Sequence, residues 1–128
     1  MSFRTKNPLK LKGKAFGSLC ENIAIDYLQN EGYRIIERNF KIPQGEIDII
    51  AQKDGYIIFV EVKGRKSSRY GPPHEAVTLQ KQKIIRLVAK AYISQNGLES
   101  QKVRFDVLGI TFSGNADKPE ITHIPFAF

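Results

Sequence analysis

The fold is decided by residues 45–63, which read GEIDIIAQKDGYIIFVEVK. Two runs rich in β-branched and aromatic side chains flank Asp54 and Gly55, and an Asp-Gly pair between such runs is a strong signal for a two-residue hairpin loop. We therefore predict an antiparallel pair of strands in which Lys53 faces Tyr56. The same register places Asp48 opposite Glu61.

The predicted hairpin has two different faces, because side chains alternate along a strand and opposed residues share a side. One face is apolar and is expected to form the core, with Ile47, Ile49, Ala51, Ile58, Val60 and Val62. The other face carries Ile50 and Phe59 near the turn, then Asp48 with Glu61, and then Glu46 with Lys63. Three carboxylates and one ammonium group are thus expected in one patch.

The pair formed by Asp48 and Glu61 needs a compensating charge or a proton, because like charges placed opposite each other destabilise two strands. Carboxylate oxygens are ligands that suit Mg²⁺ or Mn²⁺. The alternative is an ordinary solvated polar face, which is common on antiparallel sheets. A register slip of one residue would also separate the two side chains. The pattern of the hairpin alone is compatible with a metal site and with an ordinary polar surface.

The composition of the chain favours an anionic partner. It has 128 residues, a length that suits one domain, and a net charge of +7 from 20 Lys and Arg against 13 Asp and Glu. We expect nucleic acid as the partner ahead of a membrane surface. The single cysteine, Cys20, leaves no internal disulfide and fits a reducing compartment. Without a membrane-length apolar run or a signal sequence, a cytoplasmic location and no membrane partner are expected.

The order of elements predicts an α/β or α+β sandwich, with a mixed central sheet flanked by helices. Hydrophobic periodicity and turn signals predict helices at about 17–31 and 78–95 and strands at 33–40, 45–53, 56–63, 103–112 and 120–124. This gives the order helix, three strands, helix, two strands. Residues 1–14 are basic and are expected to form a flexible N-terminal arm, with a single domain over residues 15–128.

Two segments are expected to border the carboxylate patch. Ser18 fits a helix N-cap with Glu21 completing a capping box, although Glu21 also borders the apolar stripe and could reach the sheet. The loop that begins at Gly64 and the next helix start supply candidate nucleic-acid-binding side chains, namely Arg65, Lys66, Arg69, Tyr70, Gln80 and Lys81. A solvated loop and an ordinary helix start are the plainer interpretation of the same residues.

The combination of Asp48 with Glu61-Val62-Lys63 on the next strand resembles the core of the PD-(D/E)XK nucleases, which have the restriction-endonuclease-like fold. A closer resemblance covers nearly the whole chain and is to the YraN-like family of small bacterial endonucleases, similar to archaeal Holliday-junction resolvases. The segments that carry it are CENIA at 20–24, GYRII at 32–36, RNF at 38–40, GEID at 45–48, FVEVK at 59–63, EAV at 75–77, KQK at 81–83, RFDV at 104–107 and HIPFAF at 123–128.

The resemblance implies a metal-dependent phosphodiesterase. The catalytic set that it implies is Glu21, Asp48, Glu61 and Lys63. The Mg²⁺ or Mn²⁺ ligands that it implies are Asp48, Glu61, the Val62 carbonyl and Glu21, with Glu46 as a possible support for Lys63. It therefore moves the interpretation of Glu21 from a helix cap toward a metal-site residue. One departure is Cys20, which stands where the family usually has glycine and packs as a small apolar side chain.

The expected function is Mg²⁺- or Mn²⁺-dependent hydrolysis of DNA, with branched recombination or repair intermediates as substrates and a homodimer by analogy with junction resolvases. The alternative is a nucleic-acid-binding module that retains the nuclease fold without turnover. A scaffold for protein partners has no positive support in the sequence. His74 and His123 are too few and too far apart to argue for zinc.

Overall fold

The order of elements is the predicted one. The computed structural model describes residues 7–67, 69, 71–112 and 118–128. The elements are η1 (Pro8–Lys10), α1 (Gly13–Asn30), β1 (Arg34–Ile42), β2 (Gly45–Lys53), β3 (Tyr56–Arg65), η2 (Pro73–Ala76), α2 (Leu79–Gln95), β4 (Lys102–Thr111) and β5 (Glu120–Ile124). Neither α1 nor α2, the helices of the described ranges, has the length and apolar character needed to cross a membrane.

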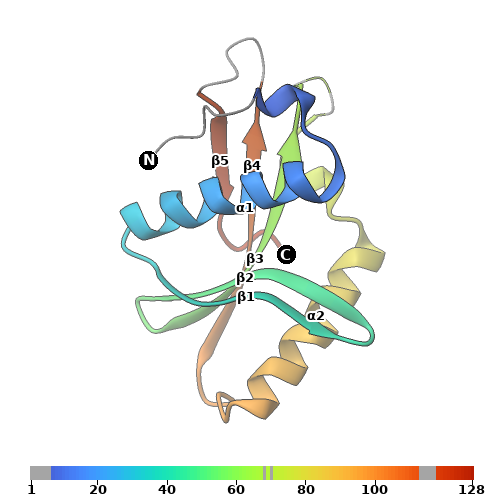
Figure 1. Cartoon of the computed structure of the whole chain (residues 1–128). Coiled ribbons are helices and arrows are strands. Elements are labelled where there is room, and N and C mark those ends of the chain that lie inside the picture. The colour runs from blue at the N-terminus through green and yellow to red at the C-terminus, as the bar shows by residue number, and fades with distance from the viewer. Residues whose placement is uncertain (1–6, 68, 70, 113–117) are drawn as a thin grey trace.

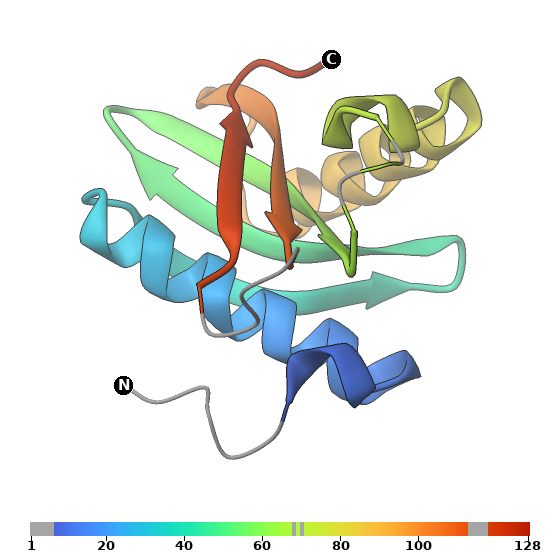
Figure 2. The same cartoon turned by 90° about the horizontal axis from the view of Figure 1, so that it is seen from above.

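One mixed sheet runs through the molecule with a helix on each face. Its strand order is β1-β2-β3-β4-β5. The β3–β4 pair is parallel and the other three pairs are antiparallel. The parallel pair requires a crossover, which α2 provides. Figures 1 and 2 show α1 against one face and α2 against the other. The predicted mixed sheet flanked by helices is confirmed.

The central hairpin has the predicted register. The pairs run from Lys53 with Tyr56 to Ile49 with Val60. Asp54 and Gly55 both have positive φ, at 52° and 83°, as a two-residue type I′ loop requires. The pairing of β2 with β3 ends at Ile49 and Val60, one pair short of Asp48 and Glu61. The predicted direct Cα pairing of Asp48 with Glu61 is therefore wrong, and the strands separate at that point.

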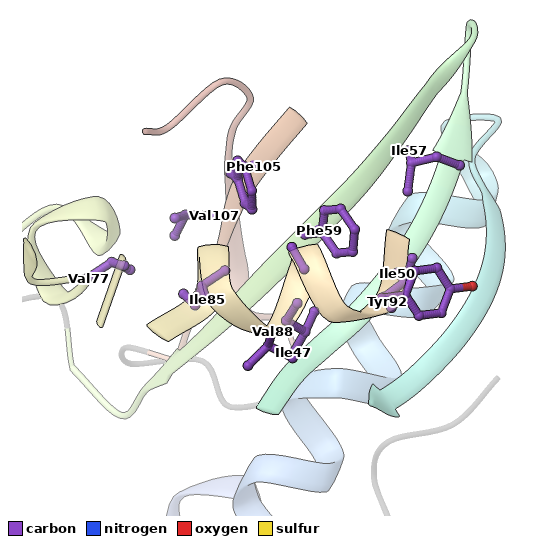
Figure 3. Close-up of a cluster of buried hydrophobic side chains, with 11 residues drawn as sticks. Ile47, Ile50, Ile57, Phe59, Val77, Ile85, Val88, Tyr92, Phe105 and Val107 are labelled. Atoms are coloured by element: carbon purple, nitrogen blue, oxygen red, sulfur yellow. The ribbon is translucent and has the colours of Figure 1, made fainter. Parts of the chain in front are cut away.

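Each face of the sheet carries a buried apolar cluster, so the expectation that only one face of the hairpin forms the core is wrong. The cluster under α2 contains Ile47, Ile50, Ile57, Phe59, Ile85, Val88 and Tyr92, as Figure 3 shows. Ile49, Ile58 and Val60 pack instead under α1. The expected grouping of Ile47 with Ile49 is wrong, because the alternation of β2 breaks between Asp48 and Ile49. The crossover helix α2 covers the face that a hairpin considered alone would leave to solvent.

The first helix begins earlier than predicted. It starts at Gly13, and its N-cap residue Lys12 makes no side-chain capping hydrogen bond. Ser18 and Glu21 lie inside the helix, so the capping-box interpretation is wrong and the Glu21 side chain is available for the sheet. Of the expected N-terminal arm, residues 1–6 lie outside the described ranges, while Pro8 is buried in η1. At α2, Thr78 is the N-cap and accepts from the Lys81 N–H at 3.2 Å.

A buried ion-pair network fixes the C-terminal segment to β4. The Asp106 carboxylate is fully buried and accepts from the Arg104 guanidinium at 2.9 and 3.0 Å, from His123 Nε2 at 2.7 Å and from the Phe126 N–H at 3.2 Å. Burial by itself would raise the pKa of Asp106, but the hydrogen bonds from His123 and Arg104 hold it below its ordinary value. Every carboxylate oxygen of Asp106 is thus matched by a donor.

Candidate active site

The candidate site lies where β2 and β3 separate. β3 stays paired with β4 over its whole length, from Tyr56 to Arg65, although its pairing with β2 stops at Val60. In the gap the Val62 N–H donates to the Asp48 carboxylate at 2.8 Å, in place of a backbone acceptor on β2. The N–H and C=O of one strand residue point to the same side. The Val62 carbonyl is therefore directed toward the same gap.

Two carboxyl groups meet in this gap. Asp48 lies on the α1 side of β2, whereas Glu61 lies on the α2 side of β3, the same side as Phe59 two residues earlier, and is 5% exposed. Burial raises the pKa of Asp48 to about 7, and the charge of Glu61 and a carboxyl–carboxyl hydrogen bond with Glu61 act in the same direction. The prediction that the two side chains share one face of the hairpin is thus wrong, but the two carboxyl groups still come together across the gap.

Two ammonium groups flank Glu61 on the α2 side. Lys63 Nζ lies 3.7 Å and Lys81 Nζ 3.5 Å from Glu61 Oε2. The expected pairing of Glu46 with Lys63 is wrong, because the break in β2 leaves Glu46 on the α1 side, where its Cα faces that of Lys41 on β1. Lys63 therefore pairs with a carboxylate of its own strand. Lys81 comes from the first turn of α2, which positions it over β3.

Glu21 reaches the α1 side of the same site. Its Oε1 lies 3.5 Å from Arg38 Nε. Asn39, with its amide nitrogen facing the acids, donates to Glu21 at 3.3 Å and to Glu46 Oε2 at 2.9 Å. Burial and then the charge of Asp48 raise the pKa of Glu21. Sequence reasoning missed Arg38 and Asn39 as site residues, although Asn39 carries a recognisable signal, since asparagine is one of the residues that tolerates its positive φ of 56°.

Cys20 fixes the approach of α1 to the sheet. A side-chain carbon at Gly64 would collide with Cys20 Sγ and come within 2.9 Å of the Phe16 ring, so α1 packs directly on the backbone at the end of β3. Burial raises the pKa of the Cys20 thiol to about 12, and it is a packing group. Glu21, the next residue, is carried toward Asp48 by this contact.

The described residues among those predicted to bind nucleic acid have different surroundings. The Arg65 guanidinium donates to the carbonyls of Gly71 and Pro72, and the Lys66 ammonium donates to the Leu11 carbonyl, so both tie loops of their own chain. Arg69 and Gln80 are exposed. Tyr70 lies outside the described residues. Lys81 alone among the six is joined to a site carboxylate by an ion pair of the described residues.

The donor set of the site consists of hard oxygen atoms. Within the described part of the chain no three His, Cys, Asp or Glu side chains are grouped so that they could hold a metal by themselves. A divalent cation would therefore be held by the carboxylates of Asp48 and Glu61 and the Val62 carbonyl, with water and substrate oxygens completing the shell, as is usual for Mg²⁺. Glu21 is close enough for its charge to interact with that of Asp48, but it is engaged by Arg38 and Asn39.

Comparison with known proteins finds a family model and several relatives that match most of the chain. The model of the family described as "Uncharacterised protein family UPF0102" matches residues 20–110. A UPF0102 protein of Geobacter metallireducens is 46% identical over 120 residues, covering 94% of this chain and 97% of its own. One of Trichlorobacter lovleyi is 49% identical over 123 residues, covering 94% and 96%. One of Dictyoglomus thermophilum is 45% identical over 103 residues, covering 80% and 87%.

Proposed function

The chain belongs to the UPF0102 family, and from the geometry of its site we propose that it is a metal-dependent nuclease that hydrolyses phosphodiester bonds in DNA. Branched recombination or repair intermediates are the substrates that its resemblance to junction resolvases favours. The observation that supports the proposal is the meeting of the Asp48 and Glu61 carboxyl groups where β2 and β3 separate, beside Lys63. The same resemblance favours a homodimer, which light scattering of the purified protein would test.

A divalent cation fits the residues that are present. Asp48 lies close to Glu61 in a largely buried position, and both this burial and the charge of Glu61 raise the pKa of Asp48. A cation with a preference for oxygen can lie between the two acids and neutralise them. When bound, Mg²⁺ or Mn²⁺ would polarise the scissile phosphate and lower the pKa of the attacking water.

The side chains around the acids have separate tasks in this proposal. The Val62 N–H fixes the orientation of Asp48, so Val62 is a positioning residue through its backbone. The Lys63 ammonium, next to Glu61, offsets negative charge that grows on the phosphate during attack, a kind of stabilisation that acts most strongly where water is excluded. Lys81 lies on the other flank of Glu61 and would contact a neighbouring phosphate once a cation has taken over the neutralisation of the acids.

The test is cleavage of a panel of branched, nicked, flapped and single-stranded DNA with Mg²⁺ and with Mn²⁺. We expect Asp48→Asn to abolish cleavage and Lys63→Ala to lower the turnover rate roughly 10²- to 10³-fold, the usual cost of losing one such electrostatic group. Asp26→Asn, a matched change in the second half of α1, should leave the rate unchanged. Equal cleavage by wild type, Asp48→Asn and Lys63→Ala would show that the site assignment is wrong.

A nucleic-acid-binding module without turnover is the second candidate, and one observation favours it. Glu61 Oε2 lies between the ammonium groups of Lys63 and Lys81, so its charge is already compensated by the chain itself. A module of this kind would retain DNA equally in EDTA and in Mg²⁺, with an affinity that falls steeply with salt. A gel-shift titration with and without Mg²⁺, run beside the cleavage panel, separates the two functions.

A further inference from the structure

A pocket of about 480 Å³ opens beside Asp48 on the α1 side of the sheet. Its walls come from the first turns of α1 and from β1 and β2, including Lys14 on one side and Lys41 on the other. The volume lies within the range of roughly 300–1,000 Å³ that is usual for ligand pockets. The proposed nuclease function uses Asp48 at one edge of this pocket and leaves the rest unassigned.

The charge of the pocket depends on whether a cation is bound at its edge. Glu21, Glu46 and Asp48 supply three carboxylates, and Lys14 and Lys41 supply two ammonium groups, so the fully ionised lining carries −1, which Arg38 beside Glu21 brings to 0. A divalent cation at Asp48 changes this to +2. The pocket thus becomes complementary to an anion when the metal is present. Both lysine side chains are exposed, and neither forms an ion pair with another of the described residues.

The shape and chemistry of the walls suit a phosphate and its sugar. Gly13 and Gly17 both line the pocket, and a side-chain carbon at either one would meet no atom within 4 Å, so these walls are open backbone. Ser18 adds a hydroxyl. The pocket is lined by no aromatic side chain of the described residues, and single-stranded bases are usually held by stacking on aromatic rings.

We propose that this pocket is a phosphate subsite, which binds a backbone phosphate next to the scissile one between Lys14 and Lys41 and contacts no base. The inference rests on the proposed nuclease function and deepens it. With Lys63 and Lys81 on the α2 side of the acids and Lys14 and Lys41 on the α1 side, the bound strand crosses the β2–β3 gap from one helix to the other. Recognition is then through the backbone and independent of sequence.

The experiment measures DNA binding by fluorescence anisotropy at several salt concentrations, in Ca²⁺ and in EDTA. We expect Lys14→Ala and Lys41→Ala each to reduce the slope of log affinity against log salt by about 0.9, the value for one phosphate contact. Because both lysines hold the same phosphate, the double variant should lose about one contact and not two. The reduction in slope should be equal for oligo-dT, oligo-dA and mixed sequences, and it should vanish in EDTA.

One control variant and one steric test complete the experiment. Lys90→Ala makes the same charge change on α2, where Lys90 lines a separate groove, and should leave the slope unchanged. Gly17→Ala replaces a glycine inside a helix with the best helix former, so the protein should fold at least as well, while the added methyl group enters the pocket and weakens binding several-fold.

The outcomes separate the subsite from the nuclease function. If wild type cleaves DNA through Asp48 but Lys14→Ala and Lys41→Ala bind like Lys90→Ala, the subsite is wrong and the nuclease stands. If nothing cleaves but both lysine variants lose a cation-dependent contact, the pocket binds a backbone phosphate as proposed and the nuclease function is wrong. A loss that depends on the base, a double variant that loses two contacts, or a wild type that does not bind DNA at all overturns the subsite.

Discussion

Replacement of Asp48 by asparagine should make the protein more stable while removing its proposed activity. The carbonyl oxygen of the introduced amide can still accept from the Val62 N–H, and the amide nitrogen can donate to Glu61. The variant therefore resembles the protonated state of the acid pair at every pH.

The magnitude follows from the pKa of Asp48, which is about 7 against an ordinary value of 3.8. Because the folded-state pKa is raised, the folded protein holds a proton that the unfolded chain releases between about pH 4 and pH 7. The free energy of unfolding therefore falls as the pH rises through this window. At about 1.4 kcal/mol per pH unit, the ionised Asp48 costs the folded state on the order of 4 kcal/mol above pH 7.

The assay is urea unfolding in EDTA at pH 5, 6, 7 and 8, followed by circular dichroism. At pH 8 we expect Asp48→Asn to be more stable than wild type by roughly 2–4 kcal/mol, which at an m-value of about 1.5 kcal/mol/M moves the midpoint up by about 2 M. The difference should shrink toward pH 5. Added Mg²⁺ should stabilise wild type, by about 2.7 kcal/mol at a hundredfold excess over Kd, and should leave the variant unchanged.

The control is Asp26→Asn, which removes one negative charge from α1 without touching the β2–β3 gap. It should follow the wild-type pH dependence. An Asp48→Asn variant that is no more stable than wild type at pH 8 would refute the reasoning, because it would mean that the ionised Asp48 carboxylate is well compensated without a cation.

Three other outcomes follow from the packing. Gly64→Ala should lower the free energy of unfolding by about 1–3 kcal/mol, because its methyl group meets Cys20 and Phe16. Chemical denaturation measures this change, and an unchanged midpoint would contradict the close packing of α1 on β3. Asp106→Asn should cost about 3–5 kcal/mol in the same measurement, since it leaves Arg104 and its partners without the buried anion. Cys20, with a pKa of about 12, should resist maleimide in the native protein and react only after unfolding.

Local signals were enough to predict the central hairpin. The Asp54-Gly55 loop requires positive φ at both positions, and the β-branched runs on either side favour strands, so turn chemistry and strand propensity fix the same register. The order of helices and strands was predictable for the same reason, because each element carries its own periodicity. The end of the β2–β3 ladder was not predictable, since it depends on β3 remaining with β4, a strand that begins only at Lys102, beyond the crossover helix.

The arrangement of the site depended on contacts distant in sequence. Lys63 was expected to pair with Glu46 across the hairpin, but the break in β2 at Asp48 moves Glu46 to the other face, and Lys63 lies beside Glu61. Lys81 approaches Glu61 from α2, and no local sequence pattern specifies the path of that helix. Local signals could not predict the early start of α1 either. Its first two turns contain Gly13 and Gly17, which are poor helix formers, and this part of the helix is stabilised where Phe16 and Cys20 pack on β3.

The two buried aspartates of the sheet have opposite environments, and the contrast argues for a cation at one of them. Asp106 accepts four hydrogen bonds, from Arg104, His123 and the Phe126 N–H, and its pKa is lowered. Asp48 accepts one, from the Val62 N–H, and otherwise faces the carboxyl of Glu61, and its pKa is raised. A carboxylate that only stabilised the strand pair would need no second acid beside it, because an asparagine would satisfy the same N–H. Asp48 thus has fewer donors around it than Asp106 has, and a divalent cation shared with Glu61 would neutralise its carboxylate as Arg104 and His123 neutralise that of Asp106.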